Sequence, residues 1–403
     1  MHDPADFDRR LTDVLGRYAE RAPVAPDIAT VADLAMGPTT TVARRWSLPM
    51  PRSGSLVVLA GLLLLALLAV VAGPGGQLFE RGPRADAIPS EPSAAVLTPS
   101  PAPTGPVIGV GEAWFAYMAT DGSARIDAVR PDGTGRHPLF PFVPGGEQEH
   151  PDWSPNGDRL VFSVHSNDTQ DLWIGGADGQ GTAMLVDCAA PCRWVDEPAW
   201  SPDAGSIAFQ RMVDDRGTGV STLEILDLAT GQTRIVYTAL VGQAAYAPRW
   251  SGDGTRLVFE LVTMASPAVE AEVTGNALAI LDLATAESAP HQITTTEDRC
   301  NNPDWSWVTD RIVCSKPLTA VGFDGPSDLY VVRPDGTGFA ALTDLAASGG
   351  EAIKPTWLPD GSGVIFSDSN GLMSTIRADG TGLAPAIVGD APDGLHARLR
   401  PTP

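Results

Sequence analysis

The phrase Pro151-Asp-Trp-Ser-Pro-Asn-Gly157, followed by the apolar run Leu160-Val-Phe162, decides the fold because it returns along the chain. Between the tryptophan and the apolar run lies Pro-Asp-Gly or a close variant, which is typical of a hairpin turn. Each copy therefore predicts a strand, a tight turn and a second strand. The five copies carry Trp153, Trp200, Trp250, Trp305 and Trp357.

A second phrase, Asp-Gly-Thr-Gly or a relative of it, follows each first phrase and joins two further short strands. The resulting unit has four antiparallel strands in roughly 40–50 residues, which is the size of a propeller blade. One such sheet cannot be stable alone, so its Trp and Phe side chains should be buried against neighbouring blades. The six copies of this phrase begin at Asp132, Asp178, Asp227, Asp282, Asp335 and Asp379.

The missing sixth copy of the first phrase should lie at the C-terminus, where Leu399-Arg400-Pro401 stands in place of Trp-Ser-Pro. The second strand of that blade would then be Ala113–Met118, so that both ends of the domain build one sheet. This arrangement removes the open edges of the ring. We therefore predict an all-β fold, a six-bladed β-propeller over residues 109–403.

These phrases resemble the Trp-Ser-Pro-Asp-Gly repeat of the TolB-like propellers, the PD40 (WD40-like) family of six-bladed domains in bacterial envelope proteins. The resemblance covers roughly residues 112–403 and rests on five near-matches in register. It implies the propeller fold and a place in the cell envelope. Residues 1–108 do not resemble the α/β domain that precedes the propeller in TolB itself.

One apolar segment precedes the repeats. Residues 56–72 read LVVLAGLLLLALLAVVA, and no charged residue occurs from Ser53 to Phe79. This length just crosses a bilayer core of roughly 30 Å at about 1.5 Å per residue. We expect a transmembrane helix over 53–73 that acts as an uncleaved anchor. A cleaved signal peptide is the alternative, but its charged leader should be only a few residues long.

The segments on either side of this helix set its expected orientation. Three arginines shortly before the span outnumber two after it, which favours a cytoplasmic N-terminus. Residues 1–52 would form a short cytoplasmic helical segment, and residues 74–108 are a Pro/Ala/Ser-rich linker. We therefore expect a single-pass protein of the cell membrane with an extracytoplasmic propeller.

Composition and motifs exclude several functions. The formal net charge is −22 and the basic residues are scattered, so we expect no nucleic-acid partner. The sequence has no serine-hydrolase elbow, zinc-protease motif, phosphate loop or dinucleotide fingerprint. We assign no catalytic residue, no metal ligand and no cofactor, and we place binding ahead of catalysis.

Strand direction alternates, so every tight turn should lie on one face of the propeller and the longer connections on the other. We call these the tight-turn face and the loop-rich face. Binding residues tend to lie on variable loops held by a rigid scaffold, which favours the loop-rich face. Its expected loops are residues 187–196, 213–221, 263–275 and 317–327.

The residue before each repeated proline should lie at the start of the innermost strand, near the mouth of the channel. A ring of such side chains could bind a small anion or, less readily, a metal ion. Alternatively, the same groups only solvate the mouth or pair with strand-end backbone. The candidate binding residues are His150, Glu197, Asn302, Lys354 and His396, with Ala247 at the remaining position.

The four cysteines should also lie on the loop-rich face. We predict the disulfides Cys188–Cys192 and Cys300–Cys314, one of three possible pairings. The alternatives are four reduced thiols, with Cys314 filling a core position, or a metal site, for which the spacing is poor.

The leading hypothesis is therefore a membrane-anchored extracytoplasmic propeller that binds or scaffolds a protein, peptide or envelope ligand on its loop-rich face. Two alternatives stay open. One is a metal-dependent hydrolase of the lactonase type with a cation in the channel. The other is a transmembrane sensor whose N-terminal helices contact a cytoplasmic partner.

Overall fold

The computed structural model describes residues 108–402, except 110, 142, 144–145, 167–168, 269–271, 285–288, 319–324 and 389–392. The chain divides into two units, 1–93 and 94–403, and every described residue belongs to the second. The expected cytoplasmic segment, the transmembrane helix and all but the last residue of the linker lie outside the described residues. Within the described part, no helix has the length and apolarity needed to span a bilayer.

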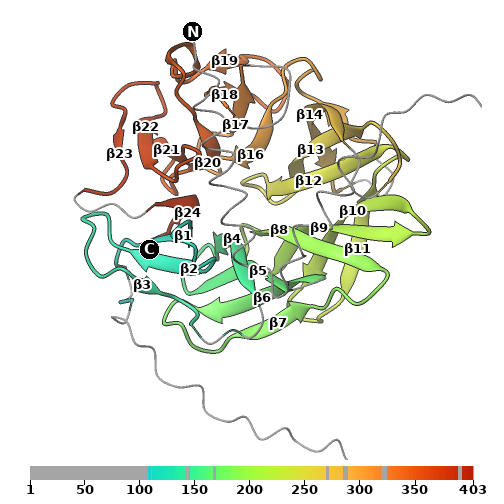
Figure 1. Ribbon diagram of the computed structural model, residues 1–403, viewed down its shortest axis with the longest axis horizontal. Coiled ribbons are helices and arrows are strands. Elements are labelled where there is room, and N and C mark those ends of the chain that lie inside the picture. Colours follow the sequence, from blue (N-terminus) through green and yellow to red (C-terminus); the bar gives the residue numbers. More distant parts are fainter. Residues whose placement is uncertain are drawn as a thin grey trace, which may run out of the picture. The chain divides into compact units, whose positions relative to one another are not determined.

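Six four-stranded antiparallel sheets stand around a central axis as the blades of a propeller (Figure 1). The all-β, six-bladed prediction is thus confirmed. In blades 1 to 5 the strands follow the chain from the axis outward. Blade 1 contains β4 (Glu147–Trp153), β5 (Arg159–Ser166), β6 (Thr169–Gly176) and β7 (Ala183–Val186). Blade 2 contains β8 (Cys192–Trp200), β9 (Ser206–Asp215), β10 (Thr218–Asp227) and β11 (Thr233–Thr238).

The next three blades repeat this order with shorter outer strands. Blade 3 contains β12 (Gln243–Trp250), β13 (Arg256–Met264), β14 (Val273–Asp282) and β15 (His291–Gln292). Blade 4 contains β16 (Asn301–Trp305), β17 (Ile312–Pro317), β18 (Ser327–Val332) and β19 (Ala340–Ala341), followed by the 3-10 turn η1 (Ala346–Ser348). Blade 5 contains β20 (Ile353–Trp357), β21 (Gly363–Ser367), β22 (Met373–Arg377) and β23 (Ala384–Pro385).

Blade 6 is built from both ends of the domain, as predicted. Its innermost strand is β24 (Gly394–Leu399), which pairs antiparallel with β1 (Phe115–Ala119). The sheet continues through β2 (Ile126–Val129) and β3 (His137–Pro138). The glycine at the start of β24 is required, because a Cβ at Gly394 would overlap the ring of Tyr117.

The core consists of hydrophobic clusters between neighbouring blades. Trp153 and Phe162 of blade 1 pack with Trp114 and Phe140 of blade 6. On the other side of blade 1, Val161 and Leu172 pack with residues of blade 2 such as Trp200. Each blade is therefore stabilised by its two neighbours, as the repeat implies.

Local hydrogen bonds explain why the two phrases form tight turns. In the Asp-Gly-Thr-Gly turn of blade 4, Asp335 Oδ1 accepts from the backbone N–H of Thr337 at 2.9 Å and from its hydroxyl at 2.7 Å. Gly336 has a φ of 79°, a left-handed conformation that favours glycine. In the first phrase, Ser201 donates to Asp203 at 2.6 Å across the turn. The repeated polar residues thus close turns and stabilise the fold.

One of the expected loops is largely strand, and a second begins and ends in strands. Residues 213–221 are mostly the paired ends of β9 and β10, joined by a turn at Arg216 and Gly217 with φ values of 55° and 86°. Residues 263–275 similarly include the ends of β13 and β14. Sequence reasoning missed these extensions because Gly, Thr and Asp interrupt the apolar alternation that predicts a strand.

Both predicted disulfides are present. Cys188 pairs with Cys192, and Cys300 pairs with Cys314. The first closes the connection into β8, and the second joins the approach to β16 with β17 of the same blade. No described cysteine is free.

Ring closure should dominate the stability of the propeller. The guanidinium of Arg400, just beyond β24, donates to the carbonyls of Gly157 at 2.7 Å and Gly109 at 2.6 Å. We expect Arg400→Ala to lower the free energy of unfolding by about 3 kcal/mol, because buried acceptors lose a charged donor. Deleting residues 394–403 should cost more, because it removes the innermost strand of blade 6 and exposes the edge of β1.

Denaturant unfolding of the purified full chain, followed by tryptophan fluorescence, measures both effects. Arg216→Ala is the control, since its side chain is 96 % exposed and should contribute almost nothing. An unchanged free energy of unfolding after deletion of 394–403 would contradict the closed ring.

Candidate functional site

The six residues that the sequence places before the repeated prolines occupy equivalent positions in the innermost strands. All six have φ values between 49° and 53°, in the left-handed region that residues other than glycine rarely adopt. A register shift in the pairing with the next strand marks a β-bulge at each position. A bulge of this kind re-aims its side chain. We call these positions the upper ring: His150, Glu197, Ala247, Asn302, Lys354 and His396.

The upper ring lies deeper than expected. In blades 1 to 3 the strand begins several residues earlier, so these positions are within the strand and not at its start. Glu197 and His396 are only 7 % and 8 % exposed. The burial of Glu197 and His396 does not fit the alternative in which these two groups solvate the channel mouth, whereas His150, Asn302 and Lys354 are partly exposed.

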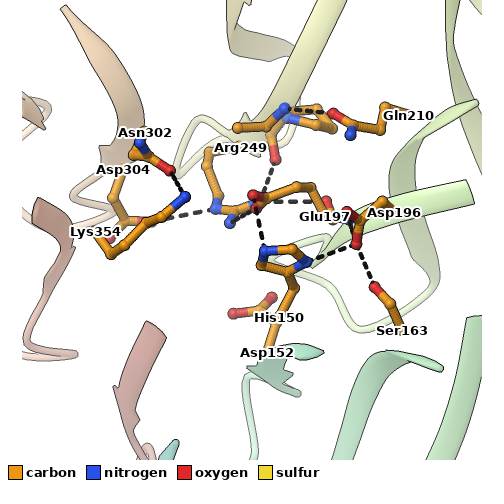
Figure 2. Close-up of polar contacts among 12 residues, drawn as sticks. His150, Asp152, Ser163, Asp196, Glu197, Gln210, Arg249, Asn302, Asp304 and Lys354 are labelled. Carbon is orange, nitrogen blue, oxygen red and sulfur yellow. Dashed lines mark hydrogen bonds and ion pairs between the residues drawn. The ribbon is translucent and has the colours of Figure 1, made fainter. Parts of the chain in front are cut away.

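The ring of His150 lies between two carboxylates. Its Nδ1 is 2.6 Å from Oδ1 of Asp196, and its Nε2 is 3.3 Å from Oε1 of Glu197. The other oxygen of Glu197 accepts from Arg249 at 3.0 Å, so Glu197 lies between the imidazole and the guanidinium (Figure 2). The structure thus brings two of the sequence-predicted residues into direct contact.

The charge states in this cluster follow from its contacts. Burial works against protonation of His150, but the charges of Asp196 and Glu197 outweigh it and raise the pKa of His150 to about 9. Burial raises the pKa of Glu197, whereas the positive charges of His150, Arg249 and Lys354 lower it to about 2 overall. Near neutral pH the pair is therefore an imidazolium and a carboxylate.

His396 lies beside His150 in a different environment. The two rings meet edge to face with centroids 4.2 Å apart. Burial and the neighbouring charge of His150 hold the pKa of His396 well below its ordinary value. Its imidazole is therefore neutral.

On the opposite side of the ring, Lys354 donates to the side-chain oxygen of Asn302 at 2.7 Å. The backbone N–H of Asn302 donates to Glu260 of the preceding blade. One blade earlier, Ala247 donates in the same way to Gln210 at 2.9 Å. A polar side chain on the second strand thus satisfies the bulged backbone of the next blade.

A second ring of side chains lies two residues further along each innermost strand, closer to the tight turns. Around the axis it reads Asp, Ala, Arg, Asp, Thr, Arg, so that the two aspartates stand opposite each other and so do the two arginines. We call it the lower ring: Asp152, Ala199, Arg249, Asp304, Thr356 and Arg398.

The charges of the lower ring compensate one another. Arg398 donates to Asp304 at 2.9 Å and lies 3.5 Å from Asp152, and Arg249 lies 3.7 Å from Asp304. Both aspartates also accept a backbone N–H from the next blade, Asp152 from Trp200 at 2.8 Å and Asp304 from Trp357 at 2.7 Å. This network links blades across the axis.

A cavity of about 330 Å³ opens at this end of the channel. The charged members of the lower ring and the five repeat tryptophans line it. Three buried N–H groups on residues of its lining, Nε of Arg249 and the indole nitrogens of Trp200 and Trp357, have no hydrogen-bond partner among the described residues. Water or an acceptor group of a ligand could satisfy them.

Sequence reasoning missed the lower ring. The signal was present, because the residue between Pro and Trp in the first phrase alternates in charge from copy to copy. It placed Asp196 near the channel mouth but as solvated surface, whereas Asp196 is buried against His150. It missed Gln210 and Glu260, whose roles depend on contacts between blades that no local pattern reveals.

Removing one lower-ring carboxylate should destabilise the propeller. We expect Asp304→Ala to lower the free energy of unfolding by about 3–5 kcal/mol, because it leaves buried arginines without a counter-charge. Denaturant unfolding measures the change. Asp215→Ala, whose side chain is 72 % exposed, is the matched control and should have little effect. A loss below about 1 kcal/mol for Asp304→Ala would show that the network is dispensable.

Glu260 should make stability depend on pH. Burial raises its pKa from 4.5 to about 7, although the hydrogen bond from Asn302 opposes this. The folded state favours the protonated form of Glu260. The group therefore does not lower the free energy of unfolding below about pH 4.5, and it lowers it progressively more as the pH rises to about 7. The full cost is on the order of 3 kcal/mol.

Glu260→Gln should remove this dependence, because Gln210 already makes the equivalent bond in the preceding blade. The variant should be more stable than the wild type at pH 8 and equally stable at pH 4. Unfolding free energies measured from pH 4 to 8 test this, and a difference independent of pH would contradict the assignment.

Comparison with known proteins supports the fold. No protein-family model and no curated protein sequence matches the chain. Among solved structures, TolB from Acinetobacter baumannii is 14 % identical with a TM-score of 0.52, covering 73 % of this chain and 68 % of that one. A candidate TolB from Agrobacterium tumefaciens is 19 % identical with a TM-score of 0.50, covering 73 % and 100 %.

Hydrazine synthase from Kuenenia stuttgartiensis, at 13 % identity, has a TM-score of 0.53 and covers 74 % of this chain and 48 % of that one. Proteins with different names thus share this architecture, and identities this low bear on fold alone. The resemblance read from the Trp-Ser-Pro-Asp-Gly repeat is confirmed at that level: the chain is a six-bladed β-propeller with a TolB-like fold.

Proposed function

We propose that the protein is a membrane-anchored, extracytoplasmic binding module that takes a protein, peptide or envelope ligand on the loop-rich face of its propeller. The anchor is the apolar segment 53–73, outside the described residues. The observation that supports binding is the pair of extended hairpins of blades 2 and 3 on the loop-rich face. We call these two hairpins the wall.

The wall consists of strands that continue beyond the upper ring. β9 and β10 have ten residues each and β13 has nine, whereas β17 and β21 of blades 4 and 5 have six and five. The extra length has its own small core, in which Met212, Ala244 and Val262 are at most 2 % exposed. Because this core stabilises the hairpins, they can hold loops in fixed positions, as binding surfaces require.

An apolar loop lies between the two blades of the wall. Leu240 and Val241, in the connection from β11 to β12, are 70 % and 76 % exposed. The loop is held by a backbone hydrogen bond from Gln243 to Leu240 at 2.8 Å. Two adjacent exposed apolar side chains on a fixed loop are suited to burial against a partner.

The disulfides support an extracytoplasmic location. Both pairs lie in the propeller, and such bonds form and persist mainly in oxidising compartments. Of the alternatives, the sensor depends on residues 1–52, which lie outside the described residues, and the hydrolase depends on the upper ring alone.

Co-purification tests the proposal. The full chain, solubilised in detergent after chemical cross-linking in its own host, should retain a specific partner that the variant Leu240→Asp/Val241→Asp loses by at least tenfold. A charge on each of these side chains would have to be desolvated in the interface, which costs affinity.

Ile235→Asp is the matched control. Ile235 is 60 % exposed and lies on β11, the outer strand of the same blade, outside the connection from β11 to β12. Retention of the partner by all variants, or its loss in the control as well, would count against the loop-rich face as the binding surface.

A further inference from the structure

Three metal-binding side chains converge in the channel from three adjacent blades. His150, Glu197 and His396 come from blades 1, 2 and 6, and one ligand atom of each lies within 4.8 Å of the other two. All three stand on left-handed bulges of the upper ring, with φ values of 50°, 52° and 53°. Their convergence is therefore built into the backbone.

The spacing suits a tetrahedral metal ion. Zinc binds nitrogen and carboxylate oxygen at about 2.0–2.2 Å, so two ligands of a tetrahedral site lie roughly 3.3 Å apart. Nε2 of His150 and Oε1 of Glu197 are 3.3 Å apart. Two imidazoles and one carboxylate favour zinc or a related transition metal over calcium or magnesium, which prefer oxygen ligands.

Neighbouring side chains orient two of the three ligands. Asp196 holds Nδ1 of His150 at 2.6 Å, which directs Nε2 toward Glu197 (Figure 2). A carboxylate on the far nitrogen of a metal-binding histidine is a common second layer of such sites. Arg249 binds Oε2 of Glu197 at 3.0 Å and leaves Oε1 facing His150.

The third ligand lacks a partner within the protein. His396 is 8 % exposed, no hydrogen bond joins its ring nitrogens to a described residue, and these nitrogens are not among the fully buried atoms that lack a partner. Its recorded ring contact is the edge-to-face packing with His150. The nitrogens of His396 are therefore open to water in the channel, and a metal ion could take the place of that water.

The nearby cations are compatible with a bound metal. Lys354 is held by Asn302 at 2.7 Å, and Arg249 also lies 3.7 Å from Asp304. Asp196 and Glu197 supply two negative charges for a divalent ion. Binding would displace the proton that His150 holds toward Glu197, and that proton leaves to solvent.

We propose that His150, Glu197 and His396 bind one Zn²⁺ or similar transition-metal ion, with Asp196 orienting His150 and a water at the fourth position. This metal site is separate from the loop-rich surface proposed to bind the partner. Either can exist without the other.

Metal titration of the full chain tests the site. The detergent-solubilised protein, prepared without a histidine tag and stripped by a chelator, should bind one Zn²⁺ per chain in calorimetry. Co²⁺ should give the visible absorption of a tetrahedral site. His396→Ala should weaken Zn²⁺ binding at least 100-fold, and Asp196→Asn should weaken it about 10- to 100-fold.

Two controls separate this site from surface binding. Glu149→Gln removes a carboxylate that lies near His150 but outside the triad, and His291→Ala removes an exposed histidine. Both should bind Zn²⁺ within twofold of the wild type. Near-UV circular dichroism checks folding, and if His396→Ala is misfolded, Glu197→Gln decides, since it keeps an oxygen toward Arg249.

No Zn²⁺ binding by the wild type would overturn the site. So would equal binding by a folded His396→Ala or Glu197→Gln, or equal losses in the two controls. Loss of the co-purified partner is a separate readout, so failure of the metal site leaves the proposed binding function standing.

Discussion

The pairing of β24 with β1 is the constraint on which the rest of this structure depends. A blade has too little core of its own and is stabilised by packing on both neighbours. Without β24, blades 5 and 6 would each lose part of an interface and a sheet edge would be exposed. The contacts beyond the pairing are consistent with this role, since Trp153 of blade 1 donates its indole N–H to the carbonyl of Arg398 at 3.1 Å.

Closure also assembles the channel. Arg398 and His396 both lie on β24, so the last strand of the chain supplies one member to each ring. Arg398 compensates aspartates of two other blades, and a buried charge that lost such a partner would be strongly destabilising. The same strand that completes the fold therefore completes the candidate site, and a defect in closure would affect both.

Much of the fold could be predicted from the sequence because the repeat is local. Trp153 and its equivalents mark each innermost strand, and the turn residues form hydrogen bonds with residues only a few positions away in the sequence. The six blades, the composite sixth blade and both disulfides followed from this. The extended hairpin through Arg216 did not, because its stabilising contacts are with β12 of the next blade. The charges that surround His150 likewise come from another blade.

The left-handed bulges show why the sequence could predict the positions of the upper-ring residues but not their contacts. Of the six upper-ring residues, asparagine and histidine are enriched in this conformation, whereas Glu, Lys and Ala are not. The conformation is therefore imposed by the packing of the strands, at a cost of about 1–2 kcal/mol for each such residue. If these positions served only to stabilise the propeller, we would expect glycine at them.

The two rings differ in what they leave unsatisfied. In the lower ring each charged carboxylate meets an arginine and a backbone N–H, so the network is largely closed and acts to hold blades together. In the upper ring Ala247 contributes no polar group, Lys354 is engaged by Asn302, and His396 has only a ring contact. At the lower ring, Nε of Arg249 and the indole nitrogens of Trp200 and Trp357 remain without a partner among the described residues. In the upper ring, the candidate metal ligands lie on the side where blades 6, 1 and 2 meet. That side adjoins blade 2, whose long hairpin forms part of the wall on the loop-rich face.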